Sequence, residues 1–246
     1  MFNNFFKNKR VLITGHTGFK GAWLSFYLYL LGSRLMGISL RPSTKPSLYE
    51  ILDLRNKLDS NFINILDKKK MERKILNFKP EIIFHLAAQA IIKKSYKDPV
   101  KTWKTNLFGT IQIFEIIRKL KKKCICVIIT SDKCYKNLEK IKGYKENDVL
   151  GGIDPYSSSK AASEIAFKSY FESFFKSTNH RVATARAGNV IGGGDWSENR
   201  IIPDCMKSKF LGKKVKIRNL KATRPWQHVI EILNGYLKLA IKLNAS

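Results

Sequence analysis

Residues 11–21, with the sequence VLITGHTGFKG, decide the fold of this chain. The apolar, β-branched residues 11–14 read as a buried strand, and Gly15, Gly18 and Gly21 follow it directly. Glycine is needed where such a turn is tight, where the backbone approaches a pyrophosphate, and where a helix packs on a strand. The helix predicted next, at 19–31, offers N–H groups and a positive dipole to phosphates. This context favours a dinucleotide site over a merely structural turn.

The rest of the chain alternates between predicted strands and helices. The strands are expected at 10–14, 35–40, 61–65, 82–85, 124–130 and 181–185, and the helices at 19–31, 71–78, 100–120 and 156–175. This alternation predicts an α/β fold, a Rossmann-like doubly wound parallel sheet with right-handed crossovers. After residue 187 glycines gather, and helices are predicted only at 201–211 and 229–243. We expect a dinucleotide-binding domain at 1–185 and an incomplete C-terminal lobe at 186–246.

The charge of the chain invites a nucleic-acid hypothesis, because 46 Lys and Arg residues against 19 Asp and Glu residues give a net charge of +27. The lysines are spread through every segment, without a recognition helix, a zinc site or a stacking platform. We therefore expect solvated faces and no nucleic-acid partner. No apolar run is long enough for a membrane span and the start lacks a signal-peptide layout, so a cytoplasmic protein without a membrane partner is expected.

The four cysteines follow no metal or disulfide framework. Cys124 and Cys126 flank one residue of a predicted strand, so both side chains point into the same packing layer. Cys134 and Cys205 are isolated. The pattern indicates reduced core thiols and no metal site.

Two groups of polar residues carry the predicted chemistry. Tyr156 and Lys160 are four residues apart and share one helix face, where the ammonium can lower the pKa of the phenol and reach a ribose. Ser131, Asp132 and Lys133 close the fifth predicted strand, at the edge where ligands bind in such sheets. They can bond a sugar hydroxyl, donate a proton and accept one. Together the groups predict hydride chemistry on an alcohol rather than an ordinary polar turn.

The choice of cofactor depends on the end of the second predicted strand. The sequence places Arg41 where an acid usually bonds the adenosine ribose of NAD. Arg41 can favour the 2′-phosphate of NADP, stack on adenine or face solvent. The residues alone therefore leave NAD and NADP open.

Several stretches resemble a known family. Residues 14–21, 85–89 and 156–160, together with Asn106, are similar to the extended short-chain dehydrogenase/reductases. Within that family, residues 15–21, 130–135, 186–196 and 224–228 resemble the CDP-glucose 4,6-dehydratases. The resemblance runs along essentially the whole chain. It implies a lyase that binds NAD and converts CDP-glucose into CDP-4-keto-6-deoxyglucose and water, with lipopolysaccharide sugars as the usual destination.

The resemblance also implies a role for each catalytic residue. Tyr156, assisted by Lys160, takes the proton of the glucose 4-hydroxyl, which Ser131 holds. Asp132 is the acid for the departing 6-hydroxyl. Lys133 acts at C5, in a position where related dTDP-sugar dehydratases carry a glutamate.

Binding residues are carried over in the same way. The lobe at 186–246 is expected to bind the nucleotide sugar, and members of the family pair through the helices that begin near Val100 and Tyr156, which implies a homodimer. Asn64 stands where relatives carry an aspartate that bonds adenine. The expected cofactor contacts are Gly15, Thr17, Gly18, Phe19, Gly21, Arg41, Asn64, Leu86, Ala87, Ala88, Tyr156 and Lys160, and the expected substrate contacts are Gln89, Asn189 and Arg224.

Some alternatives stay open. Asn189 can be a loop cap, and Arg224 can be a surface arginine held by Trp226. Family members extend beyond the length of this chain, so the cleft is expected to lack a wall. Another extended family member, such as an epimerase or reductase, and an inactive dinucleotide-binding relative are the competing functions.

Overall fold

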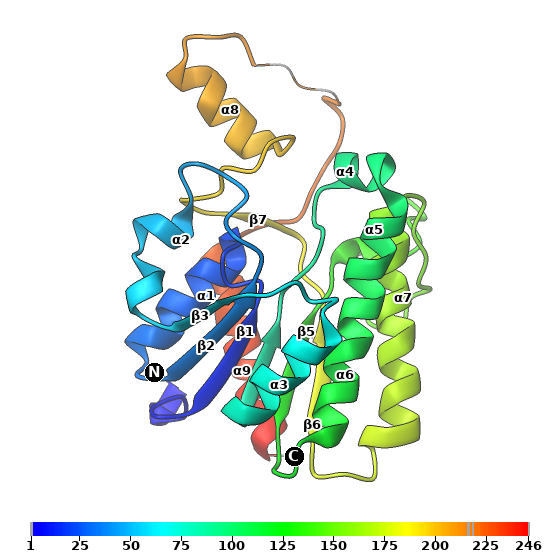
Figure 1. Ribbon diagram of the computed structural model, residues 1–246. Helices are drawn as coiled ribbons and strands as arrows, with labels where there is room; N and C mark the ends of the chain where they lie inside the picture. The colour runs from blue at the N-terminus through cyan, green and yellow to red at the C-terminus, as the bar shows by residue number, and fades with distance from the viewer. Residues whose placement is uncertain (1, 216, 218, 246) are drawn as a thin grey trace.

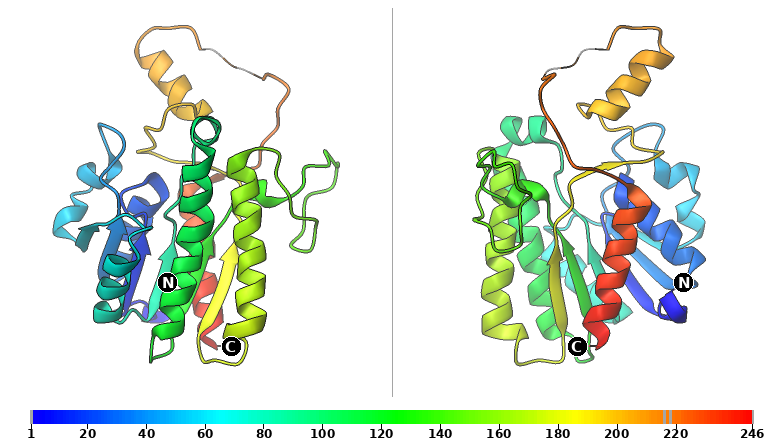
Figure 2. Two further views of the ribbon diagram at one scale, coloured as in Figure 1. Left: turned by 45° about the vertical axis from the view of Figure 1, so that its right-hand side comes forward. Right: turned by 180° about the vertical axis from the view of Figure 1, so that it is seen from behind.

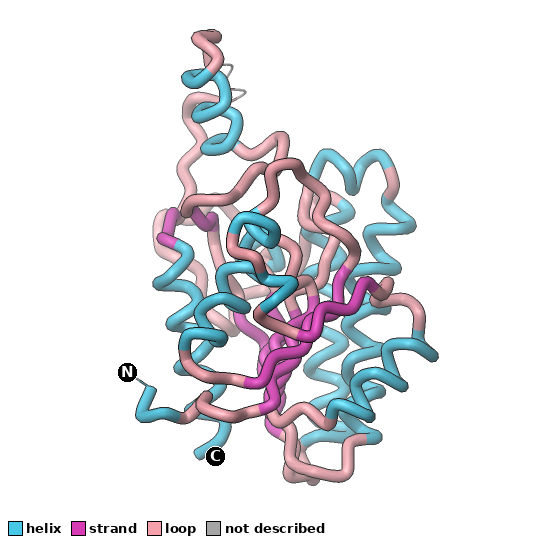
Figure 3. The backbone as a smooth tube through the Cα atoms, turned by 60° about the vertical axis from the view of Figure 1, so that its left-hand side comes forward, coloured by secondary structure: helices cyan, strands magenta, loops and turns pink. Residues whose placement is uncertain are grey.

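The computed structural model describes residues 2–215, 217 and 219–245, and its centre is a six-stranded parallel sheet in the order β3-β2-β1-β4-β5-β6. The strands are β1 (Arg10–Thr14), β2 (Arg34–Ser39), β3 (Asp59–Phe62), β4 (Ile82–His85), β5 (Ile125–Ile129) and β6 (Arg181–Ala185). Figure 1 shows them running side by side, and Figure 3 shows their common twist. The order reverses between β1 and β4, so the predicted doubly wound sheet is confirmed.

Helices cover both faces of the sheet, because side chains of successive strand residues point to opposite faces. Val11 and Ile13 belong to the cluster under α1 (Phe19–Leu30) and α9 (Val229–Ala245), whereas Leu12 faces the opposite cluster. That second cluster is completed by α3 (Lys68–Phe78), α6 (Gly109–Lys119) and the helical turn after α7 (Pro155–Tyr170). The four central strands are therefore packed between helices, whereas the edge strands β3 and β6 are less buried (Figure 2).

Several predicted boundaries differ from the structure. The third strand spans Asp59–Phe62 rather than 61–65. The single helix predicted at 100–120 is divided into α5 (Pro99–Trp103), a π-helical turn η3 (Lys104–Phe108) and α6, and the helix predicted at 156–175 ends in a second π-helical turn, η5 (Phe171–Phe175). A π turn inserts one residue without breaking the apolar pattern, so periodicity does not reveal it.

Short elements connect the large ones and were not predicted. They are η1 (Phe2–Asn4), α2 (Leu48–Ile51), η2 (Leu54–Asn56), α4 (Ile92–Lys97), η4 (Asp132–Cys134), β7 (Asn189–Ile191) and β8 (Trp226–His228). β7 and β8 pair in parallel, and α8 (Ile201–Phe210) stands beyond the carboxyl ends of the sheet (Figure 1). None of the α8 residues is buried.

The helix α9 belongs with the sheet, although the sequence places it in the lobe expected at 186–246. Val229, Leu233, Tyr236 and Leu237 are buried in the same cluster as β1 and β5. Their spacing of three and four residues gives α9 one apolar stripe. Of the expected lobe, α8 lies outside this core, whereas Ala187 is buried in it and Val190 packs against it.

The cysteine prediction holds for three of four residues. Cys124, Cys126 and Cys134 are buried, and Cys124 and Cys126 lie in one cluster as predicted, whereas Cys205 on α8 is half-buried. Burial raises the pKa of the Cys134 thiol to about 12, as expected for an inert core thiol.

Residues 2–215, 217 and 219–245 contain neither a membrane-spanning helix nor a cluster of metal-binding side chains. None of their helices has both the length and the apolar character that a membrane crossing needs. Their His, Cys, Asp and Glu side chains form no group of three or more that could hold a metal ion.

The glycine-rich turn gives the first prediction. A Cβ on Gly21 meets the carbonyl oxygen of Gly15 at 2.1 Å, so we expect Gly21→Ala to lower the free energy of unfolding by at least about 2 kcal/mol. Gly235, inside α9, is the matched control because a Cβ there meets nothing within 4 Å. Gly235→Ala should raise the free energy by about 0.5–1 kcal/mol in the same urea titration. Equal values for the two variants would contradict this.

Candidate active site

The glycine-rich turn and the end of β4 form a backbone cradle. Gly15 adopts φ +79°, and a Cβ there would lie 2.8 Å from the backbone nitrogen of Ala87. Gly18 begins α1 with no side chain capping the helix, so the amino-terminal N–H groups remain available to a ligand. The hydroxyl of Thr17 bonds Ser39 and the Leu40 carbonyl, which ties the turn to the end of β2. Of the predicted cofactor residues, the structure brings these together with Leu86 and Ala88, beside Ala87.

A hydrogen-bonded chain of buried side chains runs from this cradle across the sheet. Ala87 N–H donates to the hydroxyl of Thr14, which then donates to His85 Nδ1 at 2.7 Å. His85 Nε2 lies 3.1 Å from the hydroxyl of Thr110, and that hydroxyl donates to the carbonyl of Asn106. Because each hydroxyl has one proton, the network assigns the neutral Nε2–H tautomer to His85. Burial, with the Lys160 charge as a smaller cause, lowers the pKa of His85 to about 3, in agreement with that tautomer.

Asn106, on the π turn η3, connects this chain to α7. Its side-chain oxygen accepts from Gln89 N–H, and its amide donates to the Gln89 carbonyl and to the hydroxyl of Ser159. The carboxamide of Gln89, predicted to contact substrate, donates to Thr102 and accepts from the Ile91 N–H. In this structure Gln89 therefore fixes the loop after β4.

The predicted catalytic residues lie together at the carboxyl end of β5. Asp154 caps α7 by accepting from Ser157 N–H, and Pro155 occupies the first turn, which places Tyr156 at the start of the helix. Ser131 lies near Tyr156, and its effect is to lower the pKa of the Tyr156 hydroxyl. Ser131 Oγ also donates to Asp132 Oδ1 at 2.9 Å. Lys133 follows on η4 and is half-buried.

The predicted lowering of the Tyr156 pKa is wrong for this structure. Burial raises the pKa of Tyr156, and this outweighs the lowering by Ser131 and Arg200. The ammonium of Lys160 donates to the carbonyl of Ile129 at 3.1 Å. Burial and the neighbouring charge of Lys20 lower the pKa of Lys160 to about 8. Desolvation, which depends on the folded environment, decides both directions.

The adenine end of the predicted cofactor site is open. The Arg41 guanidinium lies 4.7 Å from the centre of the Phe62 ring, in a cation–π contact at the surface. Asn64 is exposed, and its side-chain oxygen accepts from the Leu66 N–H. The structure therefore places both residues past the ends of β2 and β3, on the side of Thr17.

The two predicted substrate residues of the lobe meet through β7 and β8. Asn189 N–H donates to the carbonyl of Pro225 at 3.0 Å, so Asn189 lies beside the residue that directly follows Arg224 in the sequence. The Arg224 side chain is exposed and donates to the Thr223 carbonyl. Trp23 Nε1 donates to the Gly193 carbonyl, so the segment that follows β7 also contacts the helix α1, which carries the predicted cofactor residue Phe19.

Sequence reasoning missed several charged residues of the site. Burial and Arg200 lower the pKa of Lys20 to about 8, while Asp132 acts to raise it, so three charged residues from distant segments face one another. The buried Glu164 and the half-buried Arg186 form an ion pair of 3.1 Å. The only available signal was that Glu164 follows Lys160 by one helical turn.

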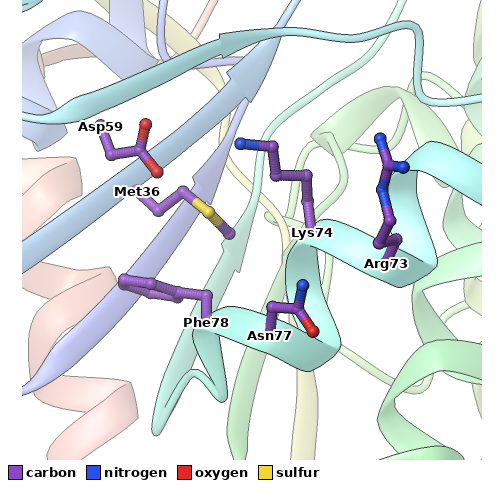
Figure 4. Close-up of a pocket in the computed structure, with 6 residues that line it drawn as sticks. All are labelled: Met36, Asp59, Arg73, Lys74, Asn77 and Phe78. Atoms are coloured by element: carbon purple, nitrogen blue, oxygen red, sulfur yellow. The ribbon is translucent and has the colours of Figure 1, made fainter.

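A pocket of about 430 Å³ lies elsewhere. Figure 4 shows its lining residues, which are Met36, Asp59, Arg73, Lys74, Asn77 and Phe78. Asp59 begins β3 and Phe78 ends α3, so this pocket lies at the amino ends of the strands. The predicted catalytic residues lie at the carboxyl ends, and the pocket is separate from them.

The sheet order and the glycine-rich cradle define a Rossmann-like, doubly wound fold. Residues 12–243 match the model of the GDP-mannose 4,6 dehydratase family, and the chain belongs to that family. It is 45% identical over 245 residues to the CDP-glucose 4,6-dehydratase of Salmonella typhimurium, covering 98% of this chain and 68% of that enzyme.

Solved structures share the fold. An epimerase from Methanothermobacter thermautotrophicus superposes with a TM-score of 0.84 at 22% identity, over 97% of this chain and 69% of that one. A double mutant of the dTDP-glucose 4,6-dehydratase of Streptomyces venezuelae, solved with NAD bound, gives 0.83 at 20% identity, over 94% and 72%.

The buried neutral histidines predict a dependence of stability on pH. Burial lowers the pKa of His85 to about 3 and, opposed by a weaker effect of the Ile38 backbone, that of His16 to about 4. Both are 6.5 in the unfolded chain, so below pH 6.5 the unfolded state binds protons that the folded state does not. Lowering the pH from 7 to 5 should therefore cost about 2 kcal/mol through each residue.

Urea unfolding at the two pH values measures this cost. The difference should shrink by about 2 kcal/mol in His85→Gln and stay unchanged in His228→Gln, whose side chain is exposed. The same pH difference in His85→Gln as in the unsubstituted chain would show that His85 is not responsible.

Proposed function

We propose that this protein is a sugar-nucleotide 4,6-dehydratase that converts CDP-glucose into CDP-4-keto-6-deoxyglucose and water. The observation that carries the proposal is the grouping of Ser131, Asp132 and Tyr156 at the strand end beside the glycine-rich cradle. The identity of 45% to the Salmonella enzyme supports the choice of CDP-glucose. The predicted site residues are proposed in the roles given by that family resemblance.

The proposed cofactor is NAD, and the residues present fit it. The close approach of Gly15 to Ala87 and the uncapped start of α1 leave a phosphate-sized backbone surface without side chains. The cradle residues at 15–21 and 86–88 would hold the pyrophosphate, Asn64 the adenine end, and Lys160 with Tyr156 the nicotinamide ribose. When bound, NAD would accept a hydride from C4 of the glucose ring and return that hydride to C6 of the sugar.

The first proton transfer is proposed for Tyr156. Its Oη takes the proton of the 4-hydroxyl, and Ser131 Oγ, which lies near Tyr156, holds that hydroxyl in place. Because burial raises the pKa of Tyr156, the phenolate needs a cation beside it. We propose that Lys160, one turn along α7, supplies this charge.

The elimination of water is proposed for Asp132 and Lys133, the two residues that follow Ser131. A 4-ketone acidifies the hydrogen at C5, and Lys133 Nζ takes that proton. Asp132 donates its proton to the departing 6-hydroxyl, which leaves as water. An acid and a base beside Tyr156 are what an elimination requires and a simple epimerisation does not, so the dehydratase is favoured over an epimerase or reductase.

A non-catalytic dinucleotide-binding protein is the second candidate. It is favoured by the exposure of the α8 helix, none of whose residues is buried. The cellular setting is proposed as the cytoplasm, with lipopolysaccharide sugars as the destination of the product.

Turnover of CDP-glucose tests the proposed function. Purified chain with NAD should form the 4-keto-6-deoxy product, followed by its alkali-induced absorbance, and Tyr156→Phe should lower the rate by about 10²- to 10⁴-fold. Tyr96→Phe, which changes an exposed tyrosine of α4, is the matched control and should keep full activity. dTDP-glucose tests nucleotide specificity. No turnover by a folded, NAD-binding chain would overturn the dehydratase and support the second candidate.

We also propose a homodimer formed through the outer faces of α5, η3 and α7. Val100, Phe108 and Ile165 are 61%, 55% and 60% exposed there, an apolar surface suited to a helical interface.

Light scattering after gel filtration tests the proposed dimer. The unsubstituted chain should have twice the mass of the protomer, and Ile165→Glu should shift it to a monomer because a charge in an apolar interface is unpaired. Leu30→Glu places the same charge on an exposed residue of α1 and should leave the dimer intact. A monomeric mass for the unsubstituted chain would refute the proposal.

A further inference from the structure

Glu164 is a buried carboxylate on the same helix face as the catalytic residues. It follows Tyr156 and Lys160 on α7 at intervals of four residues, so the three side chains form one row. Its side chain is only 4% exposed. It accepts hydrogen bonds from the hydroxyls of Thr130 and Thr184 and from Arg186 Nη2. A buried carboxylate with three donors has a fixed position.

The donors of Glu164 belong to the strand ends that carry the catalytic segment. Thr130 directly precedes Ser131, and Thr184 lies in the neighbouring strand β6. The backbone joins the same two strands, because Thr130 N–H donates to the Ala185 carbonyl and Asp132 N–H donates to the Ala187 carbonyl. Glu164 therefore holds α7 to the place where Ser131 and Asp132 leave the sheet.

Arg186 extends this contact to the chain segment that joins Asp132 to Tyr156. Its Nη1 donates to the Glu146 carbonyl at 2.9 Å, and its guanidinium lies 4.7 Å from the centre of the Tyr135 ring. Tyr135 starts a loop that returns through a bridge to Leu150, just before the cap of α7. One guanidinium thus contacts this segment at Tyr135 and at Glu146 and also contacts the carboxylate on α7.

We propose that Glu164 and Arg186 are a positioning pair that fixes the Tyr156–Lys160 face of α7 against Ser131 and Asp132. The pair contacts the strands and the loop, whereas the reacting atoms belong to the other four residues. This inference rests on the proposed function for its effect on turnover. Its effect on cofactor binding does not depend on turnover.

The pair also acts on the charge of Lys160. The groups that face Lys160 are Lys20 from α1, Glu164 from α7, Cys134 from η4 and His85 from β4, and Glu164 raises the pKa of Lys160 against Lys20 and burial. Removing the carboxylate therefore lowers the pKa of Lys160 further. The protonated ammonium that Tyr156 requires is then lost at a lower pH.

The test compares Glu164→Gln with Glu172→Gln in the full chain. Glutamine keeps the shape of Glu164 but removes its charge and replaces one of its two acceptor oxygens with an NH₂ donor, whereas Glu172 is an exposed glutamate shortly after α7 that pairs with Lys176. We expect Glu164→Gln to lower kcat at least about 10-fold with KM for CDP-glucose within about twofold. NAD binding should weaken at least about threefold, and the alkaline limb of kcat should move to lower pH. Glu172→Gln should change none of these.

Arg186→Lys is the second variant, and it decides the outcome if Glu164→Gln does not fold. Lysine keeps the buried charge pair but lacks the fork that reaches both Glu164 and the Glu146 carbonyl, so NAD binding should weaken in the same direction. NAD binding and turnover equal to those of the unsubstituted chain, in the folded variants, would overturn the positioning role. If the unsubstituted chain shows no turnover, the proposed function fails, and the NAD affinities of the variants still decide this inference.

Discussion

The structure depends on the contact between two stretches of backbone at the point where the strand order reverses. Gly15 passes so close to Ala87, and Gly21 so close to the carbonyl of Gly15, that a Cβ at either glycine would overlap the neighbouring chain. This contact allows α1 to begin directly behind β1 and leaves its amino terminus bare. The edge of the sheet is thereby both closely packed and accessible to phosphate, since the surface that faces a ligand is main chain.

Polar side chains then connect this edge to α7, the helix that carries Tyr156 and Lys160. The side chains of Thr14, His85 and Thr110 each donate to the next group, and Thr110 donates to the Asn106 carbonyl. The side-chain amide of Asn106 then donates to Ser159 on α7. On the other side of Tyr156, Glu164 joins α7 to the end of β5 and to β6. The helix α7 is thus held from two sides by buried groups whose donors and acceptors are matched, which favours one relative placement of the strands and the helix.

The sequence predicts the parts of this arrangement that depend on local pattern. The strands β4 and β6 have the predicted bounds because each is a short, mostly apolar stretch of sequence between polar or turn residues. The grouping of Ser131 with Tyr156 follows from the alternation of strands and helices, because a helix that follows a parallel strand begins at the edge where the strand ends. The π turn that carries Asn106 does not change the apolar spacing, and the pairing of Glu164 with Arg186 joins residues 22 positions apart, so neither is visible in the sequence. The direction of the Tyr156 pKa depends on burial, which only the assembled fold determines.

The exposure of α8 has a consequence for the energetics of ligand binding. Arg200, at its amino end, is one of the charges that act on Lys20 and Tyr156, yet no residue of α8 itself is buried. A helix of this length has little stability of its own in water. The amide protons of α8 are therefore expected to exchange with solvent far faster than those of β5. A nucleotide sugar that contacts this helix must also supply the free energy to order it, so its measured affinity understates the strength of its contacts.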